Sequence, residues 1–154
     1  MKVVIALGSN MGDSNSHLHH AIEELGESIE IQVVSSFYKT APVGGPVQDD
    51  FLNAVLIAET MMDPLDLLVV MQEVEVMAGR TRDLHWGPRT LDLDLISYGD
   101  MIVSEPHLTL PHPRAFERAF VLEPWLEIDP TASLIGCGPI AELLVSAKRN
   151  AIKR

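Results

Sequence analysis

Apolar side chains recur along the chain in two different patterns, which predict strands and helices. Continuous or alternating runs rich in aliphatic, β-branched and aromatic residues predict four strands, at residues 3–7, 31–38, 51–60 and 91–98. Apolar residues at helical spacing predict one helix over 16–26 and a second that starts at Asp63 and ends at Gly79. In this second helix the spacing predicts a buried side made of Leu65, Leu68, Val69, Gln72 and Val76. Two shorter helices are predicted at 114–122 and 139–148.

The main elements follow the order strand, helix, strand, strand, helix, strand. This is the split βαβ order of ferredoxin-like folds, so we expect an α+β sandwich with a mostly antiparallel sheet and helices packed on one face. The length of 154 residues suits one domain over residues 1–154, and no repeat or linker divides the chain.

Two aspartates stand in the last predicted strand. Asp92 and Asp94 are two residues apart, so on a strand they project from one face with about 6.5 Å between them. Leu91, Leu93 and Leu95 alternate with them and are expected to be buried, which would fix the register. Paired carboxylates without a cysteine partner favour Mg²⁺ over zinc. The alternative is the solvated face of a half-exposed strand.

An arginine cluster precedes the aspartates. Arg80, Arg82 and Arg89 are suited to bidentate contacts with phosphate oxygens. Arginines beside paired carboxylates are what a magnesium nucleotide requires, and Trp86 between them could stack on a planar group. The alternative is a salt-bridged surface loop in which Trp86 is a core anchor.

Three further polar residues are candidates for the site, each with a structural alternative. His112, between two prolines, could bind a phosphate or transfer a proton, or could be structural. Asn53 lies in an apolar run, where its amide could read the edge of a heterocycle or bond to neighbouring backbone. Glu75 is either an exposed helix acid or a residue that orients the arginines. Arg114 and Arg118 are expected to share a helix face.

Longer motifs surround these candidates. The strings GRTR over residues 79–82 and WGPRTLDLD over residues 86–94 are joined by ALGSN at 6–10, SFYKT at 36–40, FLNA at 51–54 and LPH at 110–112. Together they closely resemble the 6-hydroxymethyl-7,8-dihydropterin pyrophosphokinases, folate-pathway enzymes that transfer pyrophosphate from ATP to a pterin alcohol. The resemblance extends over most of the chain, and it implies the same ferredoxin-like fold.

The resemblance also implies roles for individual residues. Asp92 and Asp94 would hold two Mg²⁺ ions and act in catalysis together with Arg80 and Arg89. In the pterin pocket, Phe120 would stack on the ring and Asn53 would read it, and the full set is Thr40, Val43, Phe51, Asn53, Trp86 and Phe120. The residues implied to bind ATP are Glu75, Arg80, Arg82, Trp86, Arg89, Thr109, His112 and Arg118.

We therefore expect an ATP-dependent diphosphokinase that converts 6-hydroxymethyl-7,8-dihydropterin and ATP into the pterin diphosphate and AMP. The alternative is a catalytically silent module on the same fold that binds a pterin or a nucleotide. Loss of an aspartate of the pair or of a loop arginine would favour that alternative, and neither is lost.

The charge balance limits the partners. Twenty-two acids against eleven bases give a net charge of −11, which disfavours nucleic acids and anionic membranes as partners. Residues 80–118 hold five of the eleven bases but only six of the acids, so a small anion such as Mg-ATP remains compatible. A single cysteine, Cys137, and the absence of a signal-peptide pattern predict a cytoplasmic protein, and we expect it to be a monomer.

Overall fold

A single antiparallel sheet forms the centre of the structure, a computed structural model that describes residues 1–41, 49–79 and 90–152. Its strand order is β2-β4-β1-β5, and β3 pairs with β4 beyond the end of β2. The strands are β1 (Lys2–Ser9), β2 (Glu30–Val34), β3 (Tyr38–Thr40), β4 (Phe51–Glu59) and β5 (Asp92–Tyr98). This mixed architecture confirms the α+β, ferredoxin-like fold expected from the order of the elements.

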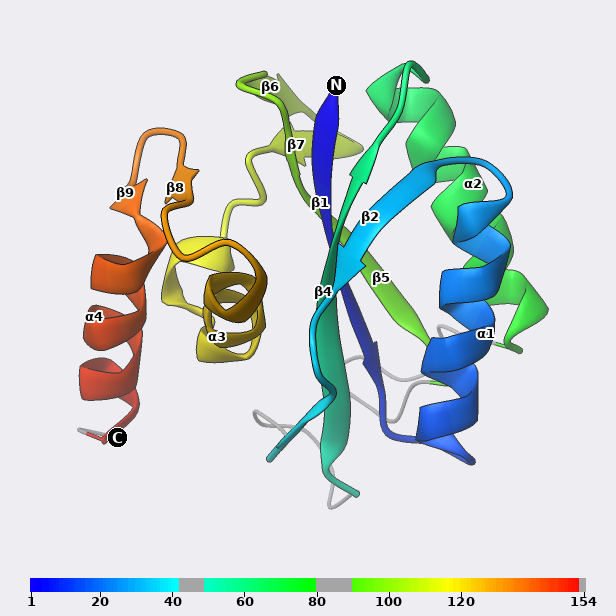
Figure 1. Ribbon diagram of the computed structural model, residues 1–154, viewed down its shortest axis with the longest axis horizontal. Helices are drawn as coiled ribbons and strands as arrows, with labels where there is room; N and C mark the ends of the chain where they lie inside the picture. The colour runs from blue at the N-terminus through cyan, green and yellow to red at the C-terminus, as the bar shows by residue number, and fades with distance from the viewer. Residues whose placement is uncertain (42–48, 80–89, 153–154) are drawn as a thin grey trace.

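Helices cover both faces of the sheet, not one face as expected. The helices α1 (Ser14–Gly26) and α2 (Pro64–Met77) lie on one face, and α3 (Ala119–Ile128) and α4 (Ile140–Ile152) lie on the other (Figure 1). The reason is that β1 and β4 are apolar at successive positions, so both of their faces must be buried. On β1, Val3, Ile5 and Leu7 join the core beneath α1 and α2, whereas Val4 and Ala6 join the core beneath α3 and α4.

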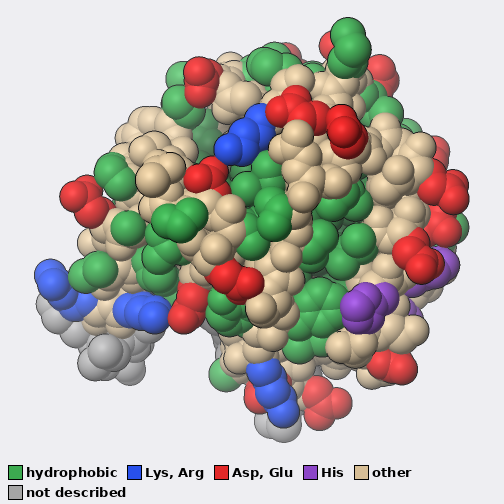
Figure 2. Space-filling model, in the orientation of Figure 1, with side chains coloured by type: hydrophobic (Ala, Val, Ile, Leu, Met, Phe, Trp, Pro, Cys, Tyr) green, Lys and Arg blue, Asp and Glu red, His purple; other side chains and the backbone are tan. Residues whose placement is uncertain are grey.

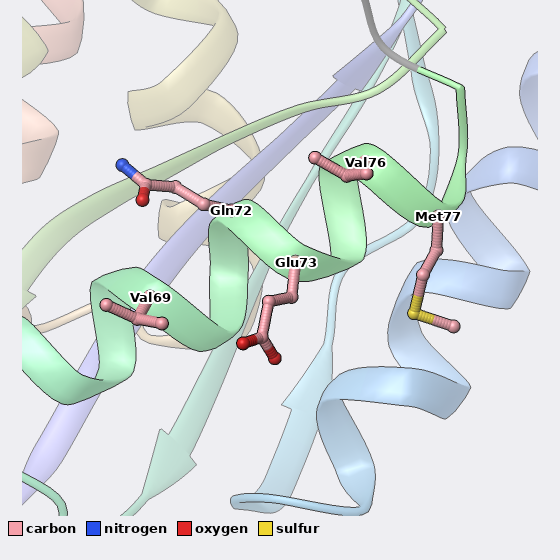
Figure 3. A pocket seen from close by; sticks show the side chains of 5 residues that line it. All are labelled: Val69, Gln72, Glu73, Val76 and Met77. Carbon is pink, nitrogen blue, oxygen red and sulfur yellow. The ribbon is translucent and has the colours of Figure 1, made fainter.

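The buried side of α2 also differs from the predicted one. Leu67, Met71, Val74 and Glu75 are the buried residues of α2. The predicted Val69 and Val76 are 51% and 71% exposed, and with Gln72, Glu73 and Met77 they line an open groove on the outer side of the helix (Figure 3). Because α2 is apolar around most of its circumference, more than one stripe of residues satisfies the helical pattern.

The segment predicted as one strand over residues 31–38 is divided in two. Ser35 interrupts it: its backbone N–H donates to the Val55 carbonyl, and its hydroxyl accepts from the Val55 N–H at 2.9 Å. After this break the chain runs past Ser36 into β3. The Glu127 carboxylate at the end of α3 accepts from the Ser36 backbone and hydroxyl and, at 2.5 Å, from the Tyr38 hydroxyl. These bonds link α3 to the start of β3.

Short elements that the sequence did not predict complete the fold. Two hairpins are formed by β6 (Val103–Glu105) with β7 (Leu108–Leu110) and by β8 (Ser133–Leu134) with β9 (Gly138–Pro139). The helix predicted at 114–122 is instead a 3₁₀ turn, η1 (Ala115–Glu117), followed by α3. Arg118 between them has extended backbone angles, so the expectation that Arg114 and Arg118 share a helix face is wrong.

Acidic side chains are scattered over the face of the molecule seen in Figure 2, in keeping with the net charge of −11. Within residues 1–41, 49–79 and 90–152, no helix has the length and apolar character needed to cross a membrane.

Candidate functional site

The paired aspartates stand at the start of β5, on the sheet face that α3 and α4 cover. Asp92 pairs with Gly8 of β1, and Asp94 pairs with Ala6. Directly opposed residues of an antiparallel pair share a face, and Ala6 belongs to the core beneath α3 and α4. Leu93 points the other way, into the core beneath α1 and α2. The two carboxylates therefore project from one face, as their spacing predicted, and both side chains are half-buried.

Asn53, Gly8 and Asp92 form a row across the sheet at this level, with a polar side chain at each end. Gly8 pairs with Asn53 of β4 on one side and with Asp92 on the other, so Gly8 separates the amide from the carboxylate. Asn53 is only 5% exposed, and its Nδ2 donates to Thr40 Oγ1 of β3 at 2.5 Å. Phe51, which opens β4, pairs with Thr40. Four of the sequence candidates are thus neighbours across the strand ends at the bottom of the sheet in Figure 1.

His112 approaches this row from the segment after β7. The imidazole Nε2 lies 3.9 Å from Asp94 Oδ1, and the imidazole Nδ1 accepts from the Arg114 backbone N–H at 3.2 Å. The backbone N–H of His112 donates to the Ile96 carbonyl. Burial lowers the pKa of His112 to about 4; Arg118 and Arg114 add to the shift and Asp92 opposes it. The imidazole is consequently neutral near pH 7. Because Nδ1 accepts a hydrogen bond, the ring hydrogen of the neutral imidazole is on Nε2. The contact of Nε2 with Asp94 is therefore a polar contact and not an ion pair.

Arg118 and Phe120 adjoin each other at the beginning of α3. The Arg118 guanidinium carbon lies 5.6 Å from the centroid of the Phe120 ring, within the range of a cation–π contact. Both side chains are half-buried, so each retains a surface available to a ligand. A cation and an aromatic ring side by side suit an anionic ligand that also carries a planar group.

Glu75 has a contact that sequence reasoning did not anticipate. The residue lies on α2, beneath the opposite face of the sheet from the aspartate side chains, and it is 4% exposed. Its Oε2 accepts from the Leu93 backbone N–H at 2.8 Å. Leu93 stands between Asp92 and Asp94 on an edge strand, so the carboxylate occupies the position that a further strand would fill. Glu75 is therefore not the exposed helix acid that was one of the two alternatives.

The remaining candidates are less closely tied to the row. Thr109 is exposed in the middle of β7, opposite Ser104 of the β6–β7 hairpin. Five candidates lie outside the described residues: Val43, Arg80, Arg82, Trp86 and Arg89.

The donor set at β5 fits magnesium. Mg²⁺ in nucleotide enzymes is held by one or two carboxylates, and substrate phosphates and water complete its coordination. Asp92 and Asp94 supply two hard oxygen donors on one face. Among the residues that the structure describes, no group of three or more histidine, cysteine, aspartate and glutamate side chains could hold a metal ion. The two aspartates would therefore be completed by phosphate and water oxygens around the ion.

Gly8 near the end of β1 and Asn10 just after it lie beside the candidate residues but were not among them, because the strand was expected to end at residue 7. Gly8 lies within the strand, between Asn53 and Asp92. Asn10 is 4% exposed, and its Nδ2 donates to the Asp49 carbonyl at 2.9 Å, which joins the end of β1 to the chain entering β4. For Asn10, its place as a polar residue directly after a buried strand was the available signal, whereas Gly8 offered none.

Comparison with protein families gives a match over most of the chain. Residues 4–130 match the family model described as 7,8-dihydro-6-hydroxymethylpterin-pyrophosphokinase (HPPK). The chain belongs to this family. The match includes every candidate site residue, from Thr40 to Phe120.

Curated relatives agree with the family. This chain is 43% identical over 156 residues to the 2-amino-4-hydroxy-6-hydroxymethyldihydropteridine pyrophosphokinase of Mycobacterium bovis, covering 93% of this chain and 82% of the relative. It is 37% identical to the Pseudomonas aeruginosa protein of the same name, covering 99% and 96%. It is 48% identical to the bifunctional protein FolKE of Lactococcus lactis subsp. cremoris, covering 80% of this chain but only 36% of FolKE. This chain thus spans about a third of that bifunctional relative.

Solved structures support the HPPK fold. A crystal structure of HPPK-DHPS in complex with substrates superposes with a TM-score of 0.77, covering 99% of this chain and 44% of that one. An HPPK-DHPS structure from Plasmodium falciparum gives 0.74, with 99% and 46% covered. Their sequence identities are 13% and 14%, so these likenesses concern the fold alone.

Proposed function

We propose that this chain transfers pyrophosphate from ATP to 6-hydroxymethyl-7,8-dihydropterin and releases AMP, a step of folate biosynthesis. The observation that carries the proposal is the register across β4, β1 and β5, in which Asn53, Gly8 and Asp92 are neighbours. The Asn53 amide, which can read a heterocycle, and the Asp92 carboxylate, which can hold a metal-bound phosphate, then lie on the two strands that flank Gly8. This arrangement suits direct transfer between two bound substrates.

Asn53 would recognise the pterin. A side-chain amide offers both a donor and an acceptor, which matches the alternating edge of a pterin ring. Its bond to Thr40 fixes the orientation of the amide before the substrate arrives. Phe51 and Phe120 would contact the faces of the ring, and Val43 and Trp86 would complete the pocket.

Asp92 and Asp94 would hold magnesium, two ions when ATP is bound. Bound magnesium would neutralise the triphosphate and polarise the oxygens at which pyrophosphate is transferred. The aspartates fix where those phosphates lie relative to the pterin. Because the His112 imidazole is neutral near pH 7, it can donate a hydrogen bond from Nε2 to a phosphate oxygen without requiring protonation.

Positive charge for the phosphates would come from arginines. Arg80 and Arg89 would act on the transferred group, and Arg82 and Arg118 would contact other phosphate oxygens. For Thr109 we retain the nucleotide contact implied by the family pattern. Glu75 would belong to the nucleotide site through its bond to the Leu93 N–H, between the two aspartates. No strong base for the pterin hydroxyl is evident among the described residues beside Asp92 and Asp94, where the His112 imidazole lies 3.9 Å from Asp94.

The product nucleotide tests this function. The protein is incubated with ATP, Mg²⁺ and the pterin alcohol, and the nucleotides are separated by chromatography. AMP is expected, in equal amount to the pterin diphosphate; ADP would contradict pyrophosphoryl transfer, and the absence of turnover would favour the silent binding module. Asp94→Asn should lower turnover by about 100-fold or more, the scale of a lost charge-stabilising group. Asp100→Asn, outside the row, is the matched control and should leave turnover unchanged.

We further propose that the chain works as one domain over residues 1–154, as a cytoplasmic monomer that binds neither nucleic acid nor membrane. The size of the protein in solution, measured by light scattering at micromolar concentration, tests the monomer. Binding to DNA, RNA and anionic vesicles tests the exclusion of those partners, and none is expected at physiological salt.

A further inference from the structure

We propose that Gly8 is a positioning residue of the pterin site, because its missing Cβ leaves the space in which the Asn53 amide is held beside Asp92. This inference rests on the proposed function, in which Asn53 reads the pterin. It concerns a residue that contacts neither phosphate nor metal in that function and that acts through its neighbour.

The backbone at Gly8 does not require glycine. Gly8 lies inside β1 and pairs with strands on both sides, and it is not among the glycines with positive φ, such as Gly12 and Gly79. Any L-residue can adopt such a strand conformation. Glycine inside a strand also costs stability, because it loses more conformational freedom on folding and has no side chain to pack. The reason for glycine here must lie in the space that its Cβ would occupy.

That space is already occupied by the edge of the Asn53 amide. A Cβ built on Gly8 would lie 3.0 Å from Asn53 Oδ1, closer than ordinary carbon–oxygen contact, and 3.9 Å from Phe51 Cδ1. Asn53 is 5% exposed and its Nδ2 is bonded to Thr40 at 2.5 Å, so the amide cannot turn away without losing that bond. A side chain at position 8 would therefore displace the group that recognises the pterin.

The same face of β1 changes character at this position. Val4 and Ala6 precede Gly8 on that face, and both pack into the core beneath α3 and α4. Gly8 is one step further, where its cross-strand neighbours are polar, Asn53 on one side and Asp92 on the other. This face of β1 thus changes from residues that pack in the core to a residue without a side chain, at the place where the two substrates would meet.

Gly8→Ala tests the inference, with Gly26→Ala as the matched control. At Gly26 the added Cβ would meet only Ile31 Cδ1 at 3.7 Å, an ordinary contact far from the row, and φ is not positive. We expect Gly8→Ala to raise KM and Kd for the pterin alcohol by about tenfold or more, because sub-ångström misplacement of a recognition group is costly. The affinity for Mg-ATP should stay within about twofold, and Gly26→Ala should change neither value. Equal losses of pterin and nucleotide affinity, or no loss in Gly8→Ala, would overturn the inference.

A double-mutant cycle with Asn53→Ala separates positioning from general damage. In the Asn53→Ala background, Gly8→Ala should lower pterin affinity by less than about twofold, because the atom that the Cβ meets is gone. Full additivity of the two changes would overturn the inference. If Gly8→Ala alone fails to fold, Asn53→Ala should restore folding, and failure to restore it would count against the contact.

Wild-type measurements distinguish this inference from the proposed function. Wild-type protein that binds the pterin while Gly8→Ala binds it equally well overturns the role of Gly8 alone. Wild-type protein that neither binds nor converts the pterin overturns the proposed function itself. The side-chain amide resonances of Asn53 add a readout independent of activity: they should move in Gly8→Ala and remain in place in Gly26→Ala.

Discussion

Replacing Glu75 with methionine should destabilise the protein and weaken its use of magnesium, whereas glutamine should be tolerated. Glu75 Oε2 accepts from the Leu93 N–H at 2.8 Å, and the side chain is 4% exposed. Methionine has a similar length but provides no oxygen, so it leaves a buried N–H without its acceptor. Glutamine retains a carbonyl oxygen of the same reach.

The size of the effect follows from this bond. An unsatisfied buried N–H costs about 1–3 kcal/mol, so the free energy of unfolding of Glu75→Met should fall below that of Glu75→Gln by that amount. Because Leu93 stands between Asp92 and Asp94, loosening the edge strand also shifts both proposed metal ligands. We expect the Mg²⁺ concentration for half-maximal activity to rise by about tenfold in Glu75→Met, the usual scale when a residue that orients metal ligands is lost.

Urea unfolding and magnesium titration of turnover measure the two effects. Glu73→Met, on the exposed side of the same helix, is the control and should change unfolding by less than about 0.5 kcal/mol. Equal stability and equal magnesium dependence of the methionine and glutamine variants would refute the reasoning. A raised KM for ATP in Glu75→Gln at saturating magnesium would instead support the nucleotide contact that the family pattern implies.

Three further predictions concern the surface and the core. The pKa of Glu127 is lowered, first by the hydrogen bond from the Tyr38 hydroxyl. The ionised carboxylate therefore stabilises the fold at neutral pH, and this contribution is lost as pH falls from the ordinary carboxyl pKa through the lowered one. Tyr38→Phe should therefore flatten the acid limb of stability against pH in thermal unfolding, and an unchanged limb would contradict the bond. The same bond raises the pKa of Tyr38 to about 12, so wild-type stability should also fall as pH rises from about 10 towards that value. On α2, Val74→Ala should lower the free energy of unfolding by about 1–3 kcal/mol, because Val74 is 5% exposed. Val76→Ala should lower it by less than about 0.5 kcal/mol, because Val76 is 71% exposed. The reverse order would support the buried side that spacing predicted.

Local patterns predicted the fold where one periodicity dominates. Leu91, Leu93 and Leu95 are all buried as expected, because strict alternation permits only one register of β5. The second helix shows the limit of this reasoning: α2 is apolar nearly all round, so spacing alone could not choose between Val74 and Val76. The helices on the second face follow from tertiary packing of the doubly apolar β1 and β4, which short motifs do not encode.

The candidate site was predictable as a set of residues but not as an arrangement. Motifs identified Asn53 and Asp92, although they come from strands that are not adjacent in the sheet. Gly8 of β1 lies between them, and glycine carries no chemical signal in a sequence. The contact of Glu75 with Leu93 was likewise hidden, because an edge N–H is visible only once the strand order is known.

The fate of the β-phosphorus of ATP tests the central claim most directly. ATP radiolabelled at that atom is incubated with the protein, Mg²⁺ and 6-hydroxymethyl-7,8-dihydropterin, and the pterin and nucleotide products are separated. The proposed chemistry predicts that the label leaves the nucleotide and appears in the pterin diphosphate, together with unlabelled AMP. Label that remains in a nucleotide product while the pterin is phosphorylated would contradict it.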